Sequence, residues 1–197
     1  MSDNVTLREL TGLTDAPSAL GESALIMIDL QNTYTRGVMT LDGVEAAVDA
    51  AAELLERARS AGTPIVHMMH DAGAGSPYDV NDDIGRIVDR VAPRGDETVI
   101  VKNYPNSFVG TNLEERLREL DRTKIILAGF MTHMCVNSTA RGAFNLGFSP
   151  TVVASTTATR SLPGAGGVDA AAVQAASLAA IADLFGVVVP DVASIPG

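Results

Sequence analysis

Short apolar runs alternate with segments of helical periodicity along most of the chain. Residues 44–60 show the periodicity clearly, with Val44, Val48 and Ala51 on one stripe. The apolar runs predict β-strands over residues 23–29, 64–69, 98–102, 124–128, 150–155 and 186–189. The periodic segments predict helices over residues 44–60, 112–121, 136–146 and 169–185, with a short helical turn within 84–91. This alternation predicts an α/β protein in which helices cover both faces of a parallel sheet.

One domain accounts for the whole pattern. The chain has 197 residues, which is enough to bury a self-sufficient core, and no linker or internal repeat divides it. Residues 1–21 are polar, contain Pro17 and lack clear periodicity, so we expect an N-terminal arm or a short lead-in helix there. The domain itself then spans residues 22–197.

The charge balance and the cysteine content narrow the class of protein. A formal net charge of −10 argues against a nucleic-acid partner or an anionic membrane surface. No apolar run approaches the roughly 20 residues that span a bilayer, and the first ten residues lack the apolar segment of a signal peptide. A single cysteine excludes an internal disulfide and fits a reducing compartment. We therefore expect a cytoplasmic protein that acts on a small molecule.

The lone cysteine lies at a chemically significant place. Residues 124–128 form a β-branched run, and a helix is predicted over 136–146 after Thr132, a candidate N-cap. Cys135 therefore falls near the start of a helix that follows the carboxyl end of a strand. Free amides and the helix dipole favour a thiolate there, as in a nucleophile elbow with sulfur in place of oxygen. A small buried hydrophobic residue is the alternative role for such a cysteine.

Three strand ends carry complementary chemistry. The first predicted strand ends at Asp29, the third ends at Lys102, and the fourth leads to Cys135. Ligands of an open parallel sheet bind outside the carboxyl ends of its strands, so these side chains are expected at one edge. A carboxylate and an ammonium group near a thiol supply a base and a counter-charge for a nucleophile. Each residue alone also fits a structural role.

Three blocks of sequence resemble the isochorismatase-like cysteine hydrolases. The blocks are IMIDLQN at 26–32, VIVKNYPNSFVGTNL at 99–113 and AGFMTHMCVNSTARGAFNLGF at 128–148. This superfamily includes nicotinamidases, N-carbamoylsarcosine, ureidoacrylate and maleamate amidases, and streptothricin hydrolases. The resemblance runs from about residue 22 to 190 and implies a three-layer α/β/α fold whose six parallel strands have the order 3-2-1-4-5-6. It is not specific to one substrate.

The resemblance also implies a role for each residue of the set. Asp29 would be the general base, Cys135 the nucleophile that forms a thioester, and Lys102 the cation that holds both. Lys102 comes from an outer strand in this order and must reach inward. The backbone amides of Met131 and Cys135 would form the oxyanion hole, with a cis peptide bond between Phe130 and Met131. The expected reaction is hydrolysis of a small amide or ureido C–N bond.

Further candidates come from the loops that follow these strands. The candidate substrate-binding residues are Gln31, Tyr34, Tyr104, Asn106, Phe108 and Thr132. Arg141 and Arg160 are candidate carboxylate ligands, although an ion pair within the fold is the better interpretation of Arg141. His70, Asp71 and His133 are placed at the pocket rim or an interface, and His67 in a structural role. His67 and His70 are three apart on a strand and should face opposite sides, so no metal site is predicted.

No cofactor is predicted, and two other functions stay open. The chain has neither G-x-G-x-x-G after the first strand nor G-x-x-x-x-G-K-[ST], which argues against dinucleotide and P-loop sites. One alternative is a hydrolase of a vinyl ether such as isochorismate, with Asp29 as the acid and no covalent role for Cys135. The other is a non-catalytic oligomeric member of the superfamily. In each case we expect a homo-oligomer, a dimer or a tetramer.

Overall fold

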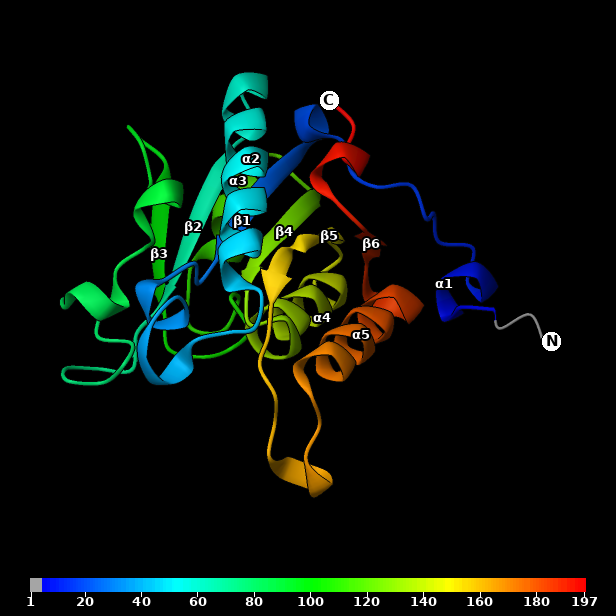
Figure 1. Cartoon of the computed structure of the whole chain (residues 1–197). Helices are drawn as coiled ribbons and strands as arrows, with labels where there is room; N and C mark the ends of the chain where they lie inside the picture. The colour runs from blue at the N-terminus through cyan, green and yellow to red at the C-terminus, as the bar shows by residue number, and fades with distance from the viewer. Residues whose placement is uncertain (1–4) are drawn as a thin grey trace.

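The computed structural model describes residues 5–197 and contains one six-stranded sheet. All strand pairs are parallel, and the order is β3-β2-β1-β4-β5-β6 (Figure 1). The strands are β1 (Ser23–Ile28), β2 (Ile65–His70), β3 (Thr98–Lys102), β4 (Lys124–Phe130), β5 (Ser149–Ala158) and β6 (Val187–Val189). Both the α/β class and the strand order implied by the resemblance are confirmed.

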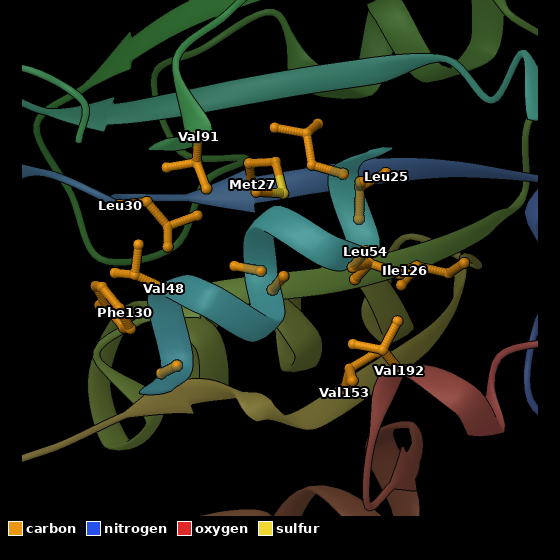
Figure 2. Packing of buried hydrophobic residues seen from close by; sticks show 14 of the residues in the cluster. Leu25, Met27, Leu30, Val48, Leu54, Val91, Ile126, Phe130, Val153 and Val192 are labelled. Carbon is orange, nitrogen blue, oxygen red and sulfur yellow. The ribbon is translucent and has the colours of Figure 1, made fainter. Parts of the chain in front are cut away.

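Helix α2 (Val44–Ala61) covers one face of the sheet. Its buried stripe includes Val48 and Leu54, which pack on Leu25 and Met27 of β1 and on Ile126 of β4 (Figure 2). Gly62 in the left-handed conformation ends the helix. This layer fixes the strands that end at the candidate site.

Three helices cover the opposite face. They are α3 (Leu113–Glu119), α4 (Asn137–Asn145) and α5 (Ala170–Ala180), and Figure 1 shows α4 and α5 side by side. Ile26 and Ile28 of β1 point to this side, while Leu25 and Met27 point to α2, because successive side chains of a strand alternate. Cys135 belongs to this second core cluster.

Several boundaries differ from the prediction. Strand β4 continues to Phe130, and β5 to Ala158 after a shift in register opposite Leu127 and Gly129. The helix predicted over 136–146 is preceded by a π-helical turn, Thr132–Val136, and the one predicted over 169–185 ends in another, Ile181–Phe185. Within residues 11–197 the other elements are 3₁₀ turns at Leu20–Glu22, Asn32–Tyr34, Gly37–Met39, Asp83–Gly85, Asp89–Val91, Gly164–Gly166 and Val192–Ser194. The apolar pattern does not distinguish these turns from α-helix.

The N-terminal arm packs on the far end of the same chain. Its short helix α1 (Leu7–Leu10) is held by Arg8, which donates to the carbonyl of Leu184 at 3.1 Å and pairs with Asp15. The backbone amide of Leu7 donates to Asp183 at 3.1 Å. Residues 1–4 of the predicted arm lie outside the described residues. Across residues 5–197, no helix combines the length and apolarity that a membrane span requires.

Candidate active site

The carboxyl end of β1 places Asp29 in a fully buried position. Its φ of +50° is left-handed, a conformation that Asp tolerates better than most residues. The side chain has no exposed surface, and within residues 5–197 neither carboxylate oxygen accepts a hydrogen bond from a backbone amide. Burial raises the pKa of this carboxyl, while Lys102 and Cys135 act in the opposite direction. Asp29 is therefore a more basic carboxylate than one in water.

Lys102 reaches Asp29 across an intervening strand. Its Nζ lies 2.7 Å from Asp29 Oδ2, and neither side chain has exposed surface. Strand β2 separates their strands, a span of about 10 Å that the lysine and aspartate side chains bridge together. The same Nζ donates to the carbonyl of Tyr104 at 3.1 Å and lies 3.5 Å from His70 Nδ1. Lys102 therefore does reach inward from its outer strand to Asp29, as the strand order requires.

Close approach of β1 and β4 brings Cys135 to this pair. Gly129 near the end of β4 has a φ of +125°, and a Cβ there would lie 1.9 Å from the carbonyl oxygen of Ile28. Only glycine fits such a contact. Cys135 follows in the π-helical turn and is 4% exposed. Asp29 and Lys102 both act on the pKa of its thiol, so the three predicted side chains do converge.

Burial around the sulfur adds an effect that the sequence did not reveal. Burial raises the pKa of the Cys135 thiol to about 12; the charge of Asp29 acts in the same direction, and Lys102 opposes it. Cys135 lies in the turn that leads into α4, as the sequence predicts, but this turn is buried, and burial opposes the stabilisation of a thiolate that a helix N-terminus was expected to give. Burial thus favours the neutral thiol over the thiolate, and Lys102 favours the thiolate.

The turn that carries Cys135 also orders the surrounding amides. The peptide bond between Phe130 and Met131 is cis, as the resemblance implied. The carbonyl of Met131 accepts from the amides of Met134 at 3.0 Å and Val136 at 3.2 Å, and not from that of Cys135 between them. Among the backbone hydrogen bonds of residues 5–197, the Met131 amide has no partner. These two amides are the predicted oxyanion donors.

The histidines separate as their spacing predicts. His67 Nε2 lies 2.9 Å from Glu97 on one side of the sheet, and His70 faces Lys102 on the other. His133 Nδ1 contacts the hydroxyl of Thr159 at 2.6 Å. Asp71 accepts the amide of Gly73 at 2.9 Å and so closes a turn. Within residues 5–197, no three His, Cys, Asp or Glu side chains are grouped as metal ligands.

Four of the candidate substrate-binding residues have structural contacts instead. Gln31 is buried, and its side-chain amide forms hydrogen bonds with backbone groups of His70 and Gly85. Thr132 is also buried and donates to the carbonyl of Ala158 at 3.0 Å. Thr132 also makes no N-cap hydrogen bond, so that prediction is wrong. Phe108 stacks on Phe148 at 5.6 Å, and Asn106 packs against α4. These hydrogen bonds and contacts engage all four side chains within the fold.

The aromatic side chains near the site include one that the sequence analysis missed. Tyr34 is buried, between Phe130 and Tyr78, at 5.8 Å from each ring. Tyr104 is 57% exposed and contributes only its backbone carbonyl, to Lys102. Tyr78 was not predicted, yet its ring lies 5.2 Å from that of His70, edge to face. The signal that was available is that Tyr78 is the only aromatic residue in the polar stretch 71–83.

The two candidate arginines have different surroundings. Arg141 lies over the ring of Phe185 at 4.1 Å and donates to Asn137 at 2.7 Å, so the ion pair expected of it is replaced by a cation–π contact. Arg160 follows β5 at the carboxyl edge of the sheet, and its buried Nε has no hydrogen-bond partner within residues 5–197. Its charge lowers the pKa of His133 and opposes the burial that raises the pKa of Tyr78. Arg160 therefore lies beside the site.

A model of the Isochorismatase domain matches residues 23–190. The chain belongs to the isochorismatase family. The secreted isochorismatase effector Isc1 of Verticillium dahliae is 36% identical to this isochorismatase-family chain over 185 residues, 93% of this chain and 96% of that protein. Maleamate amidohydrolase of Pseudomonas putida is 32% identical over 153 residues, 66% of this chain and 69% of that protein.

A solved structure shares nearly the whole fold. The crystal structure of an isochorismatase from Pseudomonas putida KT2440 has a TM-score of 0.94 and 37% identity, with 98% of this chain and 99% of that chain covered. Family members thus include both an amidohydrolase and proteins described as isochorismatases. Because one similar protein is secreted, the cytoplasmic location of this family member stays a prediction.

Proposed function

We propose that this chain hydrolyses the C–N bond of a small carboxamide or ureido compound through a thioester on Cys135. The observation that carries the proposal is the ion pair between Asp29 and Lys102, fully buried and in electrostatic contact with the only cysteine. Buried charges of this kind are costly to a fold and concentrate at functional sites. The similarity to a maleamate amidohydrolase supports the same bond type.

In the acylation step Asp29 takes the thiol proton as Cys135 Sγ attacks the carbonyl carbon. Because the pKa of Asp29 is raised, the difference between the pKa of its carboxyl and that of the Cys135 thiol is smaller, and the proton transfer is less unfavourable. The oxyanion receives hydrogen bonds from the backbone amides of Met131 and Cys135. The C–N bond then breaks, and the leaving nitrogen takes the proton from Asp29.

In the deacylation step a water molecule attacks the thioester carbonyl. Asp29 takes a proton from that water, and the C–S bond breaks to release the acid. The proton passes to the departing sulfur, which restores the Cys135 thiol. Lys102 keeps Asp29 ionised between the two steps and balances the charge of the sulfur as it leaves.

Ammonia release from a panel of amides tests the proposal. The panel contains maleamate, ureido acids, nicotinamide and a streptothricin-like lactam. We expect Cys135→Ala to abolish turnover with the fold intact, and Asp29→Asn to cost comparable activity, because base and nucleophile act as a unit. Acid-quenched wild-type protein should carry one acyl group by intact mass. Full turnover by Cys135→Ala would contradict the covalent mechanism.

A second candidate is hydrolysis of a vinyl ether such as isochorismate. The observation that favours it is the raised pKa of Asp29, because a protonated carboxyl is the acid that protonates such a substrate. The high pKa of Cys135 is also compatible with a non-covalent role. Isochorismate turnover that survives Cys135→Ala and is lost in Asp29→Asn would establish this function in place of the first.

Arg160 supports a substrate that carries a carboxylate. In residues 5–197 no acidic side chain pairs with it, although the chain has a net charge of −10 and seven other arginines form ion pairs. A half-buried guanidinium without a counter-ion suits a bidentate carboxylate ligand. We therefore propose that the substrate is a short amide with an acid group.

Maleamate and its neutral diamide, maleamide, separate this role from a structural one. Arg160→Gln should raise the KM for maleamate roughly 10- to 100-fold, because a charge-assisted hydrogen bond is lost. The KM for maleamide should stay within about twofold of the wild-type value. Arg141→Gln is the matched control, because that arginine is also without an acidic partner but stacks on Phe185. Equal losses on both substrates would contradict the assignment of Arg160.

A further inference from the structure

The segment between β2 and β3 forms a compact loop beside the site. It begins after His70 at the end of β2, and its first part, residues 71–85, ends in the 3₁₀ turn Asp83–Gly85. Inside the loop Asp79 accepts the amides of Gly75 at 2.9 Å and Asn81 at 3.0 Å. Gly85 packs so tightly on this hub that a Cβ would lie 2.1 Å from the carbonyl oxygen of Asp79. The loop is therefore internally braced.

One buried side chain joins the two ends of this loop. Gln31 Nε2 donates to the carbonyl of His70 at 3.0 Å and to that of Gly85 at 2.6 Å. Gln31 Oε1 accepts the amide of His70 at 2.9 Å. Three hydrogen bonds from a side chain without exposed surface thus fix the base of the loop. Asn32 adds a bond to the carbonyl of Asp83 at 2.8 Å.

The braced loop presents Tyr78 to the catalytic cluster. The ring lies edge to face on His70 at 5.2 Å and tilted on Tyr34 at 5.8 Å. It is half-buried, at the boundary between the cluster and solvent. Burial raises the pKa of its hydroxyl and a hydrogen bond with Tyr34 opposes this, while the charges of Cys135, Arg160 and Asp29 also act on it. Tyr78 is the only aromatic residue in the sequence of this loop, residues 71–85.

We propose that Tyr78 limits the size of the group that reaches Cys135, and that Gln31 positions Tyr78 by joining the ends of the loop. Tyr78 is then a specificity-determining residue and Gln31 a positioning residue that does not touch substrate. The inference deepens the proposed function, because it concerns access to the same sulfur. It does not require that any amide be turned over.

Alkylation of the single cysteine tests the inference without turnover. The probes are iodoacetamide and the bulkier N-phenyliodoacetamide, with rates followed by intact mass at mildly alkaline pH. In each reaction sulfur displaces iodide, and the thiol proton passes to solvent. The rate for the bulky reagent is divided by the rate for iodoacetamide, and this ratio is compared with the same ratio for N-acetylcysteine. The comparison measures how strongly the surroundings of Cys135 exclude the bulky reagent. Cys135 is the only cysteine, so the adduct is unambiguous.

We expect Tyr78→Ala to reduce this discrimination roughly tenfold, a typical effect of removing steric exclusion from a small pocket. Tyr78→Phe should keep it, and Tyr78→Trp should increase it, an outcome that general destabilisation does not produce. Gln31→Leu should reduce it about threefold. The double variant should match Tyr78→Ala alone, because residues that act through one another are not additive.

Thr63→Val is the matched control for Gln31. Thr63 is also buried and donates one hydrogen bond to the carbonyl of Leu20 at 3.0 Å. It lies just before the start of β2, at the end of the strand away from the loop. It should lower stability and leave the ratio unchanged. An unchanged ratio in Tyr78→Ala, or a Cys135 that stays unreactive in that variant, would overturn the role of Tyr78. Additive effects in the double variant would overturn the role of Gln31. Ammonia release enters none of these outcomes, so the proposed function fails or stands separately.

Discussion

At the residue scale the decisive feature is a buried ion pair. Asp29 and Lys102 lose all contact with water, and their mutual attraction offsets only part of that cost. A well-packed apolar pair of similar volume would stabilise a fold as well or better. A purely structural account therefore does not explain why both charges are present, whereas the proposed role of Asp29, a base that must stay ionised next to a thiol, does.

Removal of one charge should destabilise the protein more than removal of both. Asp29→Asn leaves the Lys102 ammonium unpaired, and Lys102→Met leaves the carboxylate unpaired; each should cost about 3–5 kcal/mol in the free energy of unfolding. Asn also tolerates the left-handed φ at position 29, so the backbone is not the cause. In urea unfolding, the double variant should have a free energy of unfolding close to that of the wild type. Both single variants and the double variant should be inactive. Additive losses in the double variant would contradict this account.

The site residues divide by how their surroundings are specified. Asp29, Lys102 and Cys135 are predictable because strand ends and sheet order bring them to one edge. Gln31 and Thr132 occupy the right loops, but their partners, such as Gly85 and Ala158, are far away in sequence. A single sequence does not reveal such hydrogen bonds. It also gives no sign that burial, rather than a helix dipole, governs the pKa of Cys135.

At the element scale the contact between α4 and the loop after β3 depends on a missing side chain. Gly142 lies within α4, and a Cβ there would lie 2.4 Å from the side-chain amide of Asn106. Asn106 in turn accepts the amide of Phe108 at 3.0 Å. The helix therefore gives up some intrinsic stability so that the loop next to Lys102 can pack closely.

Gly142→Ala should destabilise the protein, although the same change in an exposed helix stabilises it by about 1 kcal/mol. The new methyl displaces Asn106, and we expect a net loss of about 1–2 kcal/mol in the free energy of unfolding. Adding Asn106→Ala removes the clash, so the double variant should be more stable than Asn106→Ala alone. Denaturant unfolding of the four proteins measures the cycle. A Gly142→Ala variant more stable than wild type would refute the contact.

At the scale of the whole molecule the three histidines act together. Burial lowers the pKa of His67 despite its contact with Glu97, and it lowers that of His70 and His133, where Lys102 and Arg160 respectively add to the effect. All three are therefore less easily protonated in the folded protein than in the unfolded chain. By linkage, their contribution to stability is complete above about pH 6.5, the pKa of an unperturbed imidazole, and is lost as the pH falls through the lower pKa values of the folded protein.

Stability should decrease as the pH falls below about 6.5, well before ordinary carboxylates titrate. Urea unfolding across that range measures the decrease, and imidazole proton NMR assigns it to individual histidines. Asp29, whose pKa is raised, works in the opposite direction and is removed from the comparison by the double variant Asp29→Asn, Lys102→Met. Stability that is flat between neutral and mildly acidic pH would show that the imidazoles are not protected in the fold.

The closure of the β2–β3 loop by Gln31 has an evolutionary consequence. Since Gln31 holds both ends by hydrogen bonds and lies two positions after the proposed general base, the stretch between them can be exchanged without moving Asp29 or Lys102. Such a stretch can be replaced by the corresponding loop of a relative. Relatives with different substrates would then vary most here while their chemical machinery stays constant, and transplanting residues 72–82 between them should transfer preference without transferring mechanism.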